Sequence, residues 1–247
     1  MSDPADEPPF ALAGADDYRA RAFEKIPDSY SPVLHLAGTV GVGLAAFVAG
    51  CLKMHDLRAV ELLAVPLMLI VSNGVEWRAH KDLLHKRRFP LHELYDRHTP
   101  QHHRVFRYED MAVRAQKELK LVLIPAIGVL AVVIAALPLA AGAGYLFGAN
   151  VGWLVLMSAA FYVVSYELTH MIYHLPEDTF VGGLSIVRVL REHHARHHDP
   201  RLMHKWNFNV TLPLFDWLHG TIAKSDEVER ARARATRPAH AAPAQST

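Results

Sequence analysis

The sequence has little of several features that define common protein classes. Its single cysteine, Cys51, excludes an intrachain disulfide framework and any cysteine-rich zinc or iron–sulfur site. Lys and Arg number 26 against 25 Asp and Glu, so the basic excess of a nucleic-acid-binding protein is missing and no nucleic-acid partner is expected. The acidic, Pro/Ala-rich start differs from a secretory signal, and no G-x-G-x-x-G dinucleotide fingerprint occurs.

Charge is also missing from long stretches of the chain. Residues 121–166 contain no Asp, Glu, Lys or Arg, which is too long a run for one membrane span and suits two. Two further apolar runs precede it, the second of them weakened by Glu61 and Asn73. A helix needs about 20 apolar residues to cross a membrane core of about 30 Å. The predicted spans are about residues 32–52, 59–77, 120–140 and 151–172.

The distribution of basic residues predicts how these spans are oriented. The segment 78–120 contains 11 Lys and Arg and the segment 175–247 contains 10, whereas the glycine-rich stretch 141–150, the expected turn between the last two spans, contains none. Because basic segments stay in the cytoplasm, both histidine-bearing segments and both termini are expected there. The predicted fold is all-α, with four transmembrane helices in two hairpins and a helical, histidine-rich cap on the cytoplasmic side.

The same patterns divide the chain into three parts. Residues 1–31 are polar and are expected to form a largely disordered leader. Residues 32–222 form the membrane domain, with cytoplasmic segments at 78–119 and 173–222. Residues 223–247 are charged, then Ala/Pro-rich, and are expected to be a disordered tail that begins as a short helix.

Histidine is the residue present in excess. Of 17 histidines, six lie in residues 80–103 and six in residues 170–198. Their spacings are H-x4-H, H-x3-HH, H-x3-H and H-x2-HH, in that order. The candidate metal ligands are His80, His85, His98, His102, His103, His170, His174, His194, His197 and His198.

These spacings suit metal binding by helices. Residues three or four apart share one face of a helix, so two imidazoles can reach one ion. Adjacent residues point about 100° apart, so an HH pair can serve two ions, and the repeated pattern predicts a dinuclear site. Imidazole ligands favour iron, zinc, copper or nickel over calcium and magnesium.

Other polar residues near the clusters are candidates for outer roles. A carboxylate can orient a ligand histidine by accepting its second ring N–H. The possible additional ligands or supporting residues are His193, His204, His219, Asp96, Glu167, Asp199 and Asn207.

Taken together, the four histidine motifs between apolar hairpins resemble those of the fatty acid hydroxylase / sterol desaturase superfamily of integral membrane di-iron oxygenases. The ending NFNVTLPLFDWLHGT, residues 207–221, is similar to that family as well, and the resemblance covers about residues 70–222. The sequence departs from the family in three places. Three residues separate His98 from His102, where two are also common. Asn209 stands where glycine is frequent, and His219 stands where an aromatic residue is frequent.

The resemblance implies an O2-dependent lipid hydroxylase of the monooxygenase type. It implies two iron ions as cofactor, which zinc can replace in purified protein, and a fatty acyl, sphingolipid or sterol-like substrate taken from the bilayer. No catalytic residue is implied beyond the metal ligands. Since the chain shows no haem or flavin domain, electrons must come from an external donor, such as a reductase with a ferredoxin or a cytochrome b5-like protein.

Two alternatives remain open at this point. A desaturase or a carotenoid-ring hydroxylase would use a similar di-iron scaffold, and the histidine pattern does not separate it from a hydroxylase. A metal-binding transporter or sensor would need no catalysis, but a transporter is expected to hold its ligands near the middle of the bilayer on broken helices. A zinc hydrolase is disfavoured because the sequence has no H-E-x-x-H motif.

Overall fold

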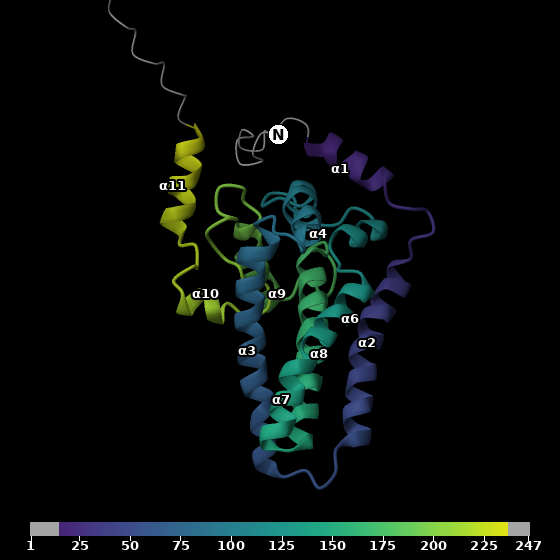
Figure 1. Ribbon diagram of the computed structural model, residues 1–247. Coiled ribbons are helices and arrows are strands. Elements are labelled where there is room, and N and C mark those ends of the chain that lie inside the picture. Colours follow the sequence, from purple (N-terminus) through teal and green to yellow (C-terminus); the bar gives the residue numbers. More distant parts are fainter. Residues whose placement is uncertain (1–14, 237–247) are drawn as a thin grey trace, which may run out of the picture.

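The computed structural model describes residues 15–236, and within this part every regular element is a helix (Figure 1). Long helices stand side by side at one end, and short helices gather at the other (Figure 1). In chain order the elements are α1 Ala15–Glu24, α2 Pro32–Lys53, η2 Ala59–Leu63, α3 Ala64–Ala79, η3 His80–Leu84, α4 His92–Arg97, η4 His98–His102, α5 His103–Val105, η5 Gln116–Leu121, α6 Ala126–Ala135, α7 Leu137–Phe147, α8 Ala149–Tyr173, α9 Ser185–His197, α10 Leu214–Leu218 and α11 Ser225–Thr236.

Four helical segments are long and apolar enough to cross a membrane, in agreement with the four predicted spans, and the chain is a multi-pass membrane protein. Their outward surfaces carry exposed apolar side chains such as Leu34, Ile127 and Phe161, which suit contact with lipid. The innermost of them, α8, packs against α2, α3, α6 and α7. The four segments are Pro32–Lys53, Ala59–Leu84, Gln116–Phe147 and Ala149–Tyr173.

The turn between the last two spans is shorter than the sequence suggested. Instead of a loop over residues 141–150, α7 continues to Phe147 and the chain reverses at Gly148, whose φ is 104°. The glycines in this stretch allow α7 and α8 to pack closely against each other. A Cβ on Gly152 would lie 2.7 Å from the Ala140 carbonyl oxygen and 3.0 Å from the Gly144 Cα, so α7 and α8 touch where both lack side chains.

The short helices form a cap over one end of the bundle (Figure 1). The expectation of a largely disordered leader is wrong for its described part, because α1 packs against α5 in this cap. Its Arg19 is buried and pairs with Glu118 at 2.6 Å and with Asp110 at 2.8 Å. The expected short helix of the tail is α11, and residues 1–14 and 237–247 lie outside the described part.

Candidate metal centre

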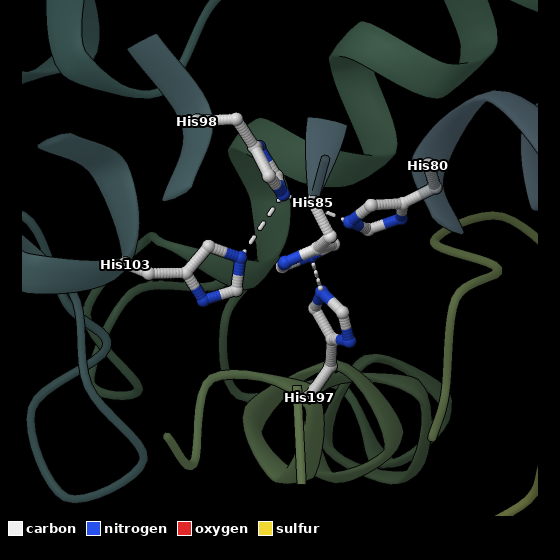
Figure 2. A group of neighbouring side chains, drawn as sticks. All are labelled: His80, His85, His98, His103 and His197. Atoms are coloured by element: carbon white, nitrogen blue, oxygen red, sulfur yellow. Dashed lines mark hydrogen bonds between the residues drawn. The ribbon is translucent and has the colours of Figure 1, made fainter. Parts of the chain in front are cut away.

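The ten candidate ligand histidines come together in two groups of five at the cap end of the bundle. Within each group, one nitrogen from every ring lies within 4.8 Å of the others, and all ten residues are buried. Figure 2 shows five of the rings arranged around one space, with His197 opposite His98. Group A consists of His80, His85, His98, His103 and His197, and group B of His102, His170, His174, His194 and His198.

The two groups are immediate neighbours in space. Each HH pair contributes one residue to each group: His103 and His197 belong to group A, and His102 and His198 to group B. The rings of His103 and His198 stack with centroids 4.3 Å apart, which brings the groups into contact. This division is the one expected of adjacent helical residues that serve two ions.

Group A depends on two π-helical turns that sequence reasoning missed. Both η3 and η4 are π-helices, and the His103 N–H donates to the His98 carbonyl five residues earlier. Residues five apart diverge by about 140° on an α-helix, but the wider turn of a π-helix, with its i→i+5 hydrogen bond, brings them much closer to one face. His80 and His85 thereby share group A, as do His98 and His103. The additional residue between His98 and His102 is taken up by this wider turn.

Group B is built from ordinary α-helical spacing. His170 and His174 lie four residues apart at the end of α8, and His194 and His198 lie four apart at the end of α9. The two helix ends face each other, with the rings of His170 and His194 centred 4.9 Å apart. The fifth ring, His102, comes from η4, 4.8 Å from His170.

Backbone carbonyls fix the tautomer of half of these rings. A carbonyl oxygen only accepts, so a ring that meets one through Nδ1 carries its hydrogen there and keeps a lone pair on Nε2. The Nδ1–oxygen distances are 2.5–2.9 Å, for the pairs His80–Phe208, His102–Leu121, His174–Met111, His197–Trp206 and His198–Phe106.

Ring nitrogens that do not bind the backbone face one another with their lone pairs, and a cation between them would remove the repulsion. The Thr99 hydroxyl donates to the Leu84 carbonyl at 2.7 Å, so it accepts from His85 Nδ1–H at 3.1 Å. His85 Nε2 then has a lone pair, as does His197 Nε2, and the two lie 2.9 Å apart with no hydrogen to share. Two nitrogen ligands set at right angles around one ion, each about 2.0–2.1 Å from it, lie about 2.9 Å apart. The residues present therefore fit a metal ion in this group.

Burial keeps the imidazoles in the form that binds metal. Burial lowers the pKa of His102 to about 4, opposed only in part by its hydrogen bond to Leu121. Burial first, and then the neighbouring rings, hold the pKa values of His98 and His103 well below the usual range. These side chains are neutral at pH 7, and a neutral imidazole nitrogen is the metal-binding species.

The predicted supporting histidines and Asn207 lie around the groups in different ways. His204 is exposed, with its ring 5.4 Å from that of His85. His193 Nε2 meets Asp216 at 3.1 Å, and Asn207 donates to the His193 carbonyl at 2.8 Å. His219 stacks on Trp77 with ring centroids 4.1 Å apart and contacts neither group.

The predicted supporting carboxylates do not hold the ligand rings. Asp96 pairs with Arg87 and Asp199 with Arg201, so both face arginine. Glu167 is buried one turn before His170, and its Oε2 accepts from the Ile124 N–H at 2.7 Å. Carbonyl oxygens and Thr99 hold the rings instead, and carbonyls leave no signal in a sequence.

Thr99 is expected to matter for metal retention. Thr99→Val keeps the shape of the side chain but removes the oxygen that accepts from His85 Nδ1, so the ring can turn or change tautomer. We expect a 10- to 100-fold loss of metal affinity at one of the two groups, which is typical for partners of ligand histidines. Competition with a metal-indicating chelator measures the affinity. Thr179→Val, in the exposed loop before α9, is the matched control, and equal affinities for the two variants would contradict the role of Thr99.

A cavity of about 260 Å³ reaches both groups from the surface of the bundle. His98 of group A and His102 and His170 of group B lie along its wall. Its other walls are mainly apolar and come from residues 121–125, Gly128, Leu84, Leu94 and Tyr166. The polar residues Glu93, Arg97 and Gln101 also line it. Ile127, which is exposed on the membrane-spanning surface, and Lys120 border it as well.

The sequence model of the family Fatty acid hydroxylase matches residues 65–221, which include all ten histidines of both groups. Comparison with curated proteins and with solved structures gives no significant match. This match covers more than half of the chain. The chain therefore belongs to the fatty acid hydroxylase family.

Proposed function

We propose that this chain is a membrane-bound di-iron oxygenase that hydroxylates an unactivated C–H bond of a lipid, with a fatty acyl, sphingolipid or sterol-like chain as substrate. The observation that carries the proposal is the pair of adjacent five-imidazole groups that border one apolar cavity. The membership of the fatty acid hydroxylase family supports the same reaction class.

The number of imidazoles favours iron at both groups. Structural zinc sites are almost always four-coordinate, whereas each group here offers five nitrogen ligands. Iron accepts imidazole ligands, and the absence of cysteine from both groups fits iron outside a cluster. Zinc remains able to take the place of iron in purified protein.

In this reaction the protein positions the lipid substrate and excludes water from the site. Bound iron would activate O2, so that one oxygen atom enters a C–H bond and the other leaves as water, with two electrons and two protons from outside. The walls of the cavity from Leu121 to Gly128 hold an acyl chain beside the histidines and exclude water. Ile127 lies where such a chain would arrive from the bilayer, because it is exposed on a membrane-spanning segment.

The electrons are proposed to come from a separate protein, a ferredoxin or a cytochrome b5-like donor with its reductase. Both histidine groups lie under the cap, so this donor docks on the cap end of the bundle, which we place in the cytoplasm. The segment 78–120 carries 11 basic and 6 acidic residues, a net charge of +5 that would attract an acidic donor.

The defining experiment joins metal analysis to product analysis. The full chain is purified from iron-supplied cells, its metals are counted per chain, and cell lipids are profiled after growth under 18O2. We expect two irons per chain and lipids that gain one 18O atom. Lipids that lose two hydrogens without gaining oxygen would identify a desaturase instead. Bound metal with unchanged lipids would contradict an enzymatic role and favour a transporter or sensor.

Filling the cavity is expected to impair the reaction without removing metal. Leu94 on α4 lines the cavity, whereas the nearby Leu91 is exposed and lies outside its lining. We expect Leu94→Trp to lower kcat/KM about 10-fold or more, because an acyl chain placed wrongly by a few methylene groups loses productive binding. Leu91→Trp is the control. Normal turnover by Leu94→Trp would show that the substrate reaches the histidines by another route.

A further inference from the structure

The segment between α9 and α11 carries almost no charge although it lies outside the four long helices. Between Lys205 and Lys224 the only charged side chain is Asp216, which is fully buried. Its carboxylate accepts from the Phe208 and Asn209 N–H groups at 2.9 and 2.8 Å and from the Thr221 hydroxyl at 2.6 Å. Asp216 thus holds the two ends of this segment together. Because Asp216 is buried, the outer surface of the segment carries no Asp, Glu, Lys or Arg.

The tip of this segment packs against the sides of two membrane-spanning helices. The Phe215 ring lies against α3 at Gly74, where a Cβ would be 2.6 Å from it. The Phe215 N–H donates to the Asn73 side-chain oxygen at 3.3 Å. Figure 1 shows α10 beside α3 and level with α9, with α11 leading the chain from there toward the end of the bundle that carries the cap.

Two helices give the same estimate of how deep this tip lies. Asn73 precedes His80 by seven residues on α3, and Tyr162, which accepts from the Asn73 amide at 2.9 Å, precedes His170 by eight residues on α8. At about 1.5 Å per residue, both place the tip about 10–12 Å from the level of the histidines toward the middle of the bundle. Asn73 and Tyr162 both lie within membrane-spanning segments.

Backbone groups at this depth must find partners inside the protein, since lipid offers none. Asn73 donates its amide to the Leu212 carbonyl at 2.9 Å. The Glu76 carboxylate accepts from the Val210 N–H, from the Thr211 N–H at 3.1 Å and from the Thr211 hydroxyl at 2.6 Å. Tyr162 joins the same cluster through Glu76 and Thr211. The polar residues that interrupt the apolar run of α3 therefore satisfy the non-helical backbone of residues 210–212.

The outer face of the segment is mainly apolar, with His219 as its exposed polar side chain, and it adjoins α3, where Phe215 packs on Gly74. Leu212, Trp217 and Leu218 are 65%, 68% and 55% exposed, and Val75 on the adjoining turn of α3 is 60% exposed. An apolar face at this depth, next to a membrane-spanning helix, lies where the acyl chains of the nearer leaflet are.

We propose that residues 208–221 form a re-entrant element, which dips into the leaflet on the histidine side, docks on Asn73 and Glu76, and returns to the cap. Its partner is the acyl-chain layer of that leaflet, which covers Leu212, Trp217 and Leu218. The proposal changes the assignment of residues 173–222 from wholly cytoplasmic to partly membrane-embedded. It depends on neither the metal nor the reaction.

Spin labels at single cysteines test this placement in nanodiscs. Cys51 is replaced by serine, and a nitroxide is attached to Leu212→Cys or Leu218→Cys. Collisions with O2, which concentrates in lipid, are compared with collisions with a water-soluble nickel chelate. Val75→Cys is the reference for lipid at the same depth, and Lys86→Cys, exposed between η3 and α4, is the reference for water. We expect the O2-to-nickel ratio at both test sites to match that at Val75. A ratio closer to that at Lys86 would overturn the proposal.

A second variant tests the docking itself. Asn73→Leu removes the amide that holds the Leu212 carbonyl and the oxygen that holds the Phe215 N–H. The label at Leu218 is therefore expected to shift toward the ratio at Lys86. Asn150→Leu is the matched control, because Asn150 forms its hydrogen bonds with His55 and Glu61 far along the chain from this segment. An unchanged ratio in Asn73→Leu would overturn the role of this residue in docking.

Discussion

His197→Ala and His198→Ala are expected to disturb two different metal ions, although the residues are neighbours in the chain. His197 belongs to group A and His198 to group B, and each faces a ring of its own group, His85 at 2.9 Å and His194 at 3.0 Å between Nε2 atoms. We expect each variant to lose about one of its two irons and to hydroxylate at least about 100-fold more slowly. Mutation of residues that only support a metal ligand already lowers metal affinity or activity 10- to 100-fold. Metal counting per chain and product analysis measure both effects.

Paired substitutions show which ion each histidine holds. The variant His85→Ala/His197→Ala removes two ligands from group A and is expected to retain one ion. The variant His194→Ala/His197→Ala takes one ligand from each group and is expected to retain neither. His55→Ala, in an exposed connection far from both groups, is the control with two ions. Equal metal contents in the two double variants would contradict the division into groups A and B.

Removal of metal is expected to lower the thermal stability of the protein strongly. Without a cation, lone pairs such as those on His85 and His197 Nε2 face each other at 2.9 Å in a buried space. A ligand present at 1,000 times its Kd adds about 4 kcal/mol to the free energy of unfolding, and two ions add about twice that. At roughly 2–4 °C per kcal/mol, we expect a chelator to lower Tm by about 15 °C or more.

The control for this experiment is the His194→Ala/His197→Ala variant, which is expected to contain no metal before chelation. The same chelator should leave its Tm unchanged. Readdition of Fe²⁺ should restore the Tm of the wild-type protein under anaerobic conditions but not that of the variant. A wild-type Tm that does not respond to chelation would mean that the buried imidazoles are stable without a cation.

The sequence allowed the four spans and the ten histidines to be identified, because both are patterns of residue type at short range. It could not predict the π-helical turns at His80 and His98. At these two turns the helix widens so that His85 and His103 reach His197, which lies on α9, far away in the chain. Nor could it predict the partners of the ring nitrogens, since five of them are backbone carbonyls that any residue supplies.

Two composition signals have a structural role that the sequence alone does not show. The glycines of residues 141–150 suggest a loop, but in the structure the missing side chains of Gly144 and Gly152 let α7 and α8 approach closely. Asn73 and Glu76 are polar residues in an apolar run, and from composition alone Asn73 weakens the second span. Their partners, Leu212 and Thr211, are more than 130 residues away in the chain, so no local pattern could reveal them.

The division of the two HH pairs has a mechanical consequence. Consecutive Cα atoms are held about 3.8 Å apart by the peptide bond, whatever the surrounding helices do. Groups A and B are therefore joined covalently at two places, through the pair His102–His103 and the pair His197–His198. A shift of α9 that pulls on one group must pull on the other by the same amount. The separation of the two ions is thus expected to stay nearly constant when α9 shifts.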